Sequence, residues 1–209
     1  KYPKFVDKFE FVPFCIDHTF WSKDEFIEND SSSSNQILFV GNDGNRNYKF
    51  VEALPGHLEN FKFKFVTEQI VNSKKFSNLD LINGNWSKGV VNDIKMRSFY
   101  KESFLTILPI KNTIQPSGQS VTLQSLATGT PILISNFDGF WDSSLFVDNK
   151  NIFFIDSFNI DEWKVKIEEI YKDQKKLKSV SKEGKKLVIS KYNLEIFTKK
   201  MIGIIEDII

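Results

Sequence analysis

Two short segments combine glycines with hydroxyl, amide and cationic side chains in a way that suits an anion. The first, VGNDGNRNY at residues 40–48, carries two glycines and Arg46 just before an expected helix. The second, QPSGQS, offers four residues that would open another helix: Ser117, Gly118, Gln119 and Ser120. Free N–H groups at a helix start, together with a guanidinium, would bind a phosphate. Each segment alone is a weak signal, because neither contains a P-loop or a GxGxxG motif.

A predicted sheet brings the two segments together. Apolar runs typical of strands lie at residues 36–41, 62–67, 78–84, 104–110, 131–135 and 151–156. Helical patterns separate most of these runs, and the connections are too long for hairpins. This predicts an α/β fold, a doubly wound, Rossmann-like parallel sheet of about six strands. Ligands of such sheets bind beyond the carboxyl ends of the strands, which is where both segments would lie.

Two further patterns predict how the sheet is flanked. The run KFKFVT at residues 62–67 alternates lysine and phenylalanine, which predicts one wet and one dry face. After Phe158 only helices are expected, with Trp163, Ile167 and Ile170 at helical spacing, a cap at Asn159 or Asp161, and a last helix over residues 194–208. The polar run ENDSSSSN at residues 28–35 is interpreted as a linker.

The composition is that of a globular protein with no global electrostatic field. The 209 residues include 28 basic and 27 acidic side chains, a net charge of +1, which argues against nucleic acid as a partner. The single cysteine excludes an internal disulfide. No apolar run approaches the roughly 20 residues that span a bilayer, and the opening lacks a signal peptide. A cytoplasmic location is predicted.

Five segments carry a resemblance to a known family: FVPFCIDHTFW, ILFVGNDGNR, FYKESFLTILPI, PSGQSVTLQSLATGTPILIS and FDGFWD. In order and spacing they resemble the nucleotide-sugar-binding C-terminal half of GT-B glycosyltransferases, most nearly the family-four-like retaining enzymes. The resemblance runs from about Phe11 to the end. It implies that residues 1–35 are an interdomain connection and linker, that residues 36–209 are the Rossmann-like donor-binding domain, and that the N-terminal acceptor domain is absent.

The resemblance also assigns roles to residues near the second segment. Ala127, Gly129 and Pro131 match the family's A-x-G-x-P ending. Aligned from there, Gln124 stands where a glutamate usually holds the nucleotide ribose, and Gln115 adjoins the position of the glutamate that usually touches the donor sugar. An amide can bond sugar hydroxyls, but it lacks the charge-assisted bond of a carboxylate.

The first segment matches the family's diphosphate-binding loop in part. Gly41 matches the family's glycine, Asn42 replaces an arginine, and Arg46 matches a later basic position. The resemblance implies that Arg46 stabilises the leaving diphosphate, while the amides of residues 117–120 hold phosphate or sugar oxygens. On this reading Gly118→Val would abolish diphosphate binding at a modest loss of stability.

The implied activity is that of a hexosyltransferase-like enzyme of polysaccharide biosynthesis. It would transfer a sugar from a nucleotide diphosphate sugar to a hydroxyl acceptor with retention, without a metal or other cofactor. The chain alone would be inactive. Its expected partners are the nucleotide sugar and the N-terminal domain, through which any peripheral membrane association would occur.

Alternatives remain open at this point. Arg46 could be a surface salt-bridge partner and Gln124 an exposed helix residue, while Trp86 and Trp141 fit core or rim positions better than base stacking. The domain could be a non-catalytic nucleotide or phosphosugar-binding module, or half of a GT-B-fold sugar-nucleotide epimerase. A response-regulator receiver is excluded, because no acidic cluster ends the first strand.

Overall fold

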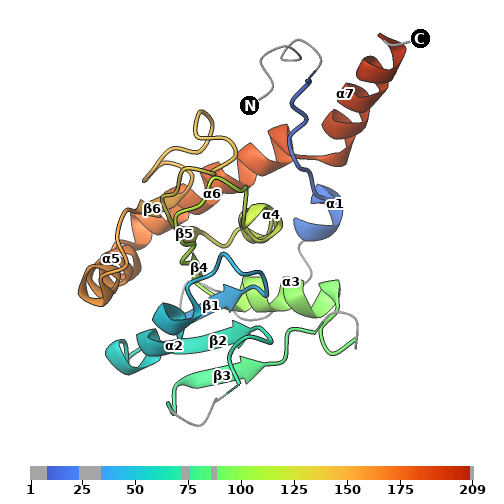
Figure 1. The fold of residues 1–209 in the computed structure, drawn as a ribbon. Coiled ribbons are helices and arrows are strands. Elements are labelled where there is room, and N and C mark those ends of the chain that lie inside the picture. The colour runs from blue at the N-terminus through green and yellow to red at the C-terminus, as the bar shows by residue number, and fades with distance from the viewer. Residues whose placement is uncertain (1–8, 24–33, 72–75, 86–88, 208–209) are drawn as a thin grey trace.

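Six parallel strands form the centre of the structure, a computed structural model that describes residues 9–23, 34–71, 76–85 and 89–207. The order across the sheet is β3-β2-β1-β4-β5-β6 (Figure 1). The strands are β1 (Gln36–Val40), β2 (Lys62–Val66), β3 (Leu79–Ile82), β4 (Leu105–Leu108), β5 (Ile132–Ser135) and β6 (Phe153–Ile155). Each falls within a predicted run, and every neighbouring pair is parallel. The predicted doubly wound α/β fold is confirmed.

Helices cover both faces of the sheet. They are α1 (His18–Trp21), α2 (Tyr48–His57), α3 (Asp93–Glu102), α4 (Gln119–Thr128), α5 (Ile160–Lys172), α6 (Gln174–Lys191) and α7 (Leu194–Glu206). On strand β1, Ile37 and Phe39 join the core beneath α2 and α5, whereas Leu38 and Val40 join the core beneath α1, α3 and α4. Burial of alternate residues in two separate cores explains why β1 is apolar throughout.

Helix ends follow the sequence signals. The side chain of Asn159 accepts hydrogen bonds from the backbone N–H groups of Asp161 and Glu162, so the predicted cap of α5 is confirmed. Trp163, Ile167 and Ile170 are all buried, as their spacing predicts. Helix α4 ends at Gly129, whose φ of +86° is a left-handed conformation that glycine adopts without strain.

The prediction that one face of β2 is exposed to solvent is wrong at Lys64. Its side chain is only 12% exposed, and its Nζ lies 3.0 Å from Glu102 Oε2 and 4.3 Å from the centre of the Phe99 ring. Helix α3 supplies both partners and covers this face. The lysine stem therefore packs under a helix while its charge is paired.

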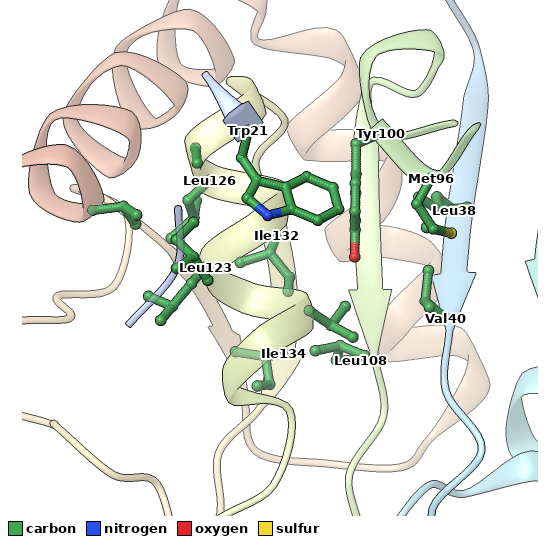
Figure 2. Packing of buried hydrophobic residues seen from close by; sticks show 14 of the residues in the cluster. Trp21, Leu38, Val40, Met96, Tyr100, Leu108, Leu123, Leu126, Ile132 and Ile134 are labelled. Carbon is green, nitrogen blue, oxygen red and sulfur yellow. The ribbon is translucent and has the colours of Figure 1, made fainter. Parts of the chain in front are cut away.

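The N-terminal segment is anchored to the domain by two buried side chains. Ile16 and Trp21 belong to the core, and the Ile16 N–H donates to the Tyr192 carbonyl over 3.0 Å. Figure 2 shows the Trp21 ring between Tyr100 and the α4 residues Leu123 and Leu126. Most of the predicted linker at residues 28–35 lies outside the described residues.

Helix α7 projects from the domain beside the N-terminal segment (Figure 1). No described residue of α7 is buried. Its exposed apolar residues are Leu194, Ile196, Met201, Ile202 and Ile205. Among the described residues, no helix is both long and apolar enough to cross a bilayer.

Candidate functional site

The two glycine-containing segments meet at the carboxyl ends of β1 and β4. Arg46 and Ile110 form an antiparallel bridge. The Asn47 N–H donates to the Pro109 carbonyl over 2.9 Å, and the Lys111 N–H donates to the Asn45 carbonyl over 2.8 Å. After β1 the chain continues to β2 on one side, whereas after β4 it continues to β5 on the other side. The carboxyl ends of β1 and β4 are therefore the topological switch point, where folds of this kind bind ligands. The predicted proximity of the two segments is confirmed.

Arg46 is held at this junction, and the residue as a whole is 2% exposed. Its Nη1 donates to Ser117 Oγ over 2.7 Å and lies 3.1 Å from Asp43 Oδ2. Its Nε is buried and has no hydrogen-bond partner within the described part of the chain. Burial lowers the pKa of Arg46, and the Asp43 carboxylate opposes that shift. Arg46 is therefore not the surface residue of the alternative interpretation, and it retains an unused N–H donor.

Gly41 makes room for this guanidinium. A Cβ at Gly41 would lie 2.8 Å from Arg46 Nε and 3.2 Å from Arg46 Cγ. The Gly41 N–H meanwhile donates to the Val66 carbonyl over 3.2 Å, which fixes the end of β1. A side chain at this position would have to displace Arg46.

Helix α4 begins directly beside Arg46 with its N-terminus open. Gly118 precedes the helix with a φ of +78°, no side chain caps it, and its first turn contains no acidic residue. The first backbone bond of the helix runs from the Thr122 N–H to the Gly118 carbonyl over 2.9 Å. The N–H groups of residues 119–121 thus have no i→i−4 partner. These amides and the helix dipole provide a second source of positive potential next to the guanidinium.

Two of the predicted donor-binding side chains, Ser117 and Asn42, already form hydrogen bonds within the protein. The Ser117 hydroxyl is buried; it accepts from Arg46 and lies 3.3 Å from Asp43 Oδ2. The Asn42 amide donates to the Gly84 carbonyl over 2.9 Å, and its oxygen accepts from the Glu68 N–H over 2.7 Å. Asn42 thus ties together the loops that follow β2 and β3. Donor binding by either side chain stays a prediction.

Gln124 lies on α4 and is half-buried, so it is not the freely exposed residue of the alternative interpretation. Its Oε1 accepts a hydrogen bond from the Tyr100 hydroxyl over 3.2 Å. Burial raises the pKa of Tyr100, and the charge of Arg46 opposes that shift. The bond to Tyr100 orients the amide and leaves its NH₂ group as the donor for a ligand. Gln115 is exposed in the loop before α4.

The aromatic residues singled out in the sequence do not form a base-stacking platform in the described residues. Trp141 stacks on Phe140 with ring centres 4.4 Å apart and contacts Phe146 edge to face. Trp86 lies outside the described residues. The structure supports the rim interpretation of Trp141. Nowhere in the described ranges do three or more His, Cys, Asp or Glu side chains gather as metal ligands.

Sequence reasoning missed two residues of this site, Asp43 and Tyr100. The i, i+3 spacing of Asp43 and Arg46 is compatible with an ion pair in a turn, and that signal was available. The Tyr100–Gln124 bond joins α3 to α4, and no local pattern indicates it.

The structure contradicts the expected effect of Gly118→Val on stability. A Cβ at Gly118 would lie 2.9 Å from Ile110 Cδ1 and 3.2 Å from Leu108 Cδ1, so it points into the core. With a left-handed backbone in addition, we expect Gly118→Val to lower the free energy of unfolding by about 2–3 kcal/mol. Urea denaturation measures this. Gly44→Ala is the matched control, because a Cβ there meets nothing within 4 Å; equal stability of the two variants would contradict the prediction.

A hollow lies away from this site. A cavity of about 570 Å³ between α5, α6 and the start of β6 is lined by Phe153, Ile170 and Leu177. Three lysines and two acidic residues also line it: Lys166, Lys172, Lys176, Glu169 and Asp173. The turn from α5 to α6 lies at the amino ends of the strands, opposite Arg46. No unpartnered buried polar side-chain atom among the described residues belongs to its lining.

Solved structures share the fold at low sequence identity. Sucrose-phosphate synthase from Thermosynechococcus elongatus superposes with a TM-score of 0.76 at 11% identity, over 99% of this chain and 56% of that one. The C-terminal domain of the group 1 glycosyl transferase LpcC from Francisella tularensis gives 0.64 at 12% identity, over 86% of this chain and 99% of that one. Anabaena HepE in complex with UDP and glucose gives 0.71 at 8% identity, over 93% and 56%.

The chain covers a different share of each of these solved structures. It spans little more than half the length of the synthase and of HepE, and nearly the whole of the Francisella C-terminal domain. A search of the curated proteins finds no match to the sequence. The family model described as "Glycosyl transferases group 1" matches residues 72–187, which is more than half of the chain. The chain therefore belongs to the group 1 glycosyl transferases.

Proposed function

We propose that this chain is the donor-binding part of a glycosyltransferase that moves a sugar from a nucleotide diphosphate sugar to a hydroxyl acceptor, with retention. The observation that carries the proposal is the buried guanidinium of Arg46 beside the open N-terminus of α4. A diphosphate is the ligand that fits both sources of positive potential at once.

The proposed chemistry depends on charge that develops on the departing diphosphate. Donors fixed in advance stabilise such charge without reorganising during the reaction. Arg46 would supply a charged donor, and the free amides of residues 119–121 at the start of α4 would supply neutral ones. No metal or other cofactor is part of this proposal.

The rest of the nucleotide would lie along α4. Gln124 would donate its NH₂ group to a ribose oxygen, in the orientation that Tyr100 fixes. Gln115 and the glycine backbone near Gly41 would flank the sugar and the phosphates. The similar fold of HepE, whose structure contains UDP and glucose, supports a nucleotide sugar as the ligand class.

We propose further that an N-terminal acceptor domain packs against α7 and residues 9–14. Both segments expose apolar side chains, among them Ile202 and Ile205 on α7 and Phe11 in the N-terminal segment. They are joined to each other, because Lys200 Nζ donates to the Phe11 carbonyl over 2.6 Å and pairs with Glu10. Without that domain no transferase turnover is expected from this chain.

Isothermal titration calorimetry with UDP, GDP, ADP and dTDP, each beside its parent nucleoside, tests the proposed function. We expect one diphosphate to bind, and to bind far more tightly than its nucleoside, because the site is built around the phosphates. Equal affinity for a nucleoside and its diphosphate, or binding of none of the four diphosphates, would contradict the proposal.

A non-catalytic nucleotide-sugar-binding module is the second candidate. The observation that favours it is the lack of both family carboxylates, because Gln124 stands at one of their positions and Gln115 only adjoins the other. Incubating a form of the protein that includes the acceptor domain with labelled nucleotide sugars separates the two candidates. Release of free sugar or formation of a glycoside shows an enzyme, whereas binding without either product favours the module.

A further inference from the structure

The proposed anion site already contains an anion of the protein's own. Asp43 Oδ2 lies 3.1 Å from Arg46 Nη1 and 3.3 Å from Ser117 Oγ. The side chain of Asp43 is 46% exposed, whereas that of Arg46 is 3% exposed. The carboxylate is therefore the solvent-accessible member of the pair, and a ligand that reaches Arg46 from solvent would come close to it.

The loop itself holds this carboxylate in place. Asp43 Oδ1 accepts a hydrogen bond from the Asn45 N–H over 2.9 Å, and the Asp43 carbonyl accepts from the Tyr48 hydroxyl over 2.7 Å. These bonds do not involve Arg46 or Ser117. A diphosphate that reaches Arg46 would consequently meet a fixed negative charge rather than a side chain free to swing away.

The charge of the ligand decides how strongly Asp43 repels it. A nucleotide diphosphate sugar carries two negative charges. The free nucleoside diphosphate carries close to three at neutral pH, because the second pKa of a terminal phosphate is about 6. Like charges about 5 Å apart repel by roughly 0.5 kcal/mol per pair where water and salt screen them, as they do around the half-exposed Asp43. Asp43 therefore repels the free diphosphate, which carries the third charge, more strongly than it repels the sugar-linked donor.

We propose that Asp43 is a specificity-determining residue that disfavours the free nucleoside diphosphate relative to the sugar-linked donor. This inference depends on the proposed function and adds a preference between its substrate and its product. The carboxylate lowers the affinity for both ligands and lowers that for the product more, which favours release of the diphosphate after transfer. Arg46 and the α4 amides supply the attraction that the carboxylate opposes.

Asp43→Asn separates charge from geometry. The asparagine oxygen can replace Oδ1 and still accept from the Asn45 N–H, whereas the NH₂ group replaces Oδ2, where it can donate to Ser117 Oγ but cannot accept from Arg46. The turn therefore keeps its hydrogen bond to Asn45 while the negative charge is lost. Asp80→Asn is the matched control, because Asp80 is an exposed carboxylate on the edge strand β3 and its replacement changes the net charge equally. Unfolding curves verify that both variants are folded.

The test is a calorimetric titration of the unmodified protein and of both variants with UDP and with UDP-glucose. If the titrations with the four nucleoside diphosphates select another base, the diphosphate and the sugar-linked donor of that base are used instead. We expect Asp43→Asn to tighten binding of the diphosphate by about threefold to tenfold and binding of the sugar-linked donor by a smaller factor. Asp80→Asn should change neither. Equal tightening of both ligands, no change, or weaker binding by Asp43→Asn would overturn the inference.

The same titrations distinguish a failure of this inference from a failure of the proposed function. If the unmodified protein binds the diphosphate and Arg46→Ala binds it about tenfold or more weakly, the site is correct and only the Asp43 result decides the inference. If Arg46→Ala binds as well as the unmodified protein, the proposed site is wrong, and the assignment of Asp43 is overturned with it.

Discussion

Arg46→Ala is expected to weaken binding of the nucleoside diphosphate by about tenfold to a hundredfold and to leave binding of the parent nucleoside nearly unchanged. A hydrogen bond from a charged group contributes about 1.5–3 kcal/mol, and each 1.4 kcal/mol is a tenfold change in affinity. Asn42 stands where the resemblance places a second cation, so the positive charge expected at that position is missing. In the longer enzyme the same change should lower kcat more than it raises the donor KM.

The control for this variant is another buried arginine. Arg97 is 3% exposed; its Nη1 donates to the Phe20 carbonyl, and its guanidinium lies 4.4 Å from the centre of the Phe20 ring. Arg97→Ala also removes a buried positive charge, but away from the α4 N-terminus, and it should not discriminate between nucleoside and diphosphate. If Arg46→Ala weakens both ligands equally, Arg46 acts through the fold rather than through the phosphates.

Trp21→Ala is expected to lower the free energy of unfolding by about 3–5 kcal/mol, the range for truncating a buried aromatic side chain. The Trp21 indole is 5% exposed and packs edge to face on Tyr100, with ring centres 6.0 Å apart (Figure 2). Truncation would leave a cavity between α1, α3 and α4. Chemical denaturation monitored by circular dichroism measures the loss.

Phe11→Ala is the matched control for that variant, because Phe11 is 58% exposed in the same N-terminal segment. Its backbone bond to Lys200 survives the substitution, so a change within about 0.5 kcal/mol is expected. A loss below about 1 kcal/mol for Trp21→Ala would show that the segment before the sheet is a detachable connection and not part of the domain.

The sheet could be predicted from the sequence because each strand carries its own local signal. Buried parallel strands are continuous apolar runs, as in the LTIL of β4 and the ILIS of β5, and glycines or polar residues bound them. Lys64 shows where this reasoning fails. Alternation predicts a wet face, but whether a helix covers that face depends on α3, which lies about 30 residues further along the chain.

The site could be predicted only in part for the same reason. Arg46 and the α4 N-terminus follow from local patterns, because glycine and cap residues mark both turns. The contacts that define their environment join residues 71 and 74 positions apart, in the bonds of Ser117 to Arg46 and to Asp43. What a Cβ at Gly118 would meet likewise depends on residues outside its segment, because Ile110 and Leu108 fill the space into which it would point.

A crystal structure of the protein with the nucleoside diphosphate selected by calorimetry tests the central claim most directly. The account predicts that phosphate oxygens lie within hydrogen-bond distance of the Arg46 guanidinium and of backbone N–H groups of residues 119–121. Phosphates bound in the cavity between α5 and α6, or at the carboxyl ends of the strands without contact to Arg46, would contradict it.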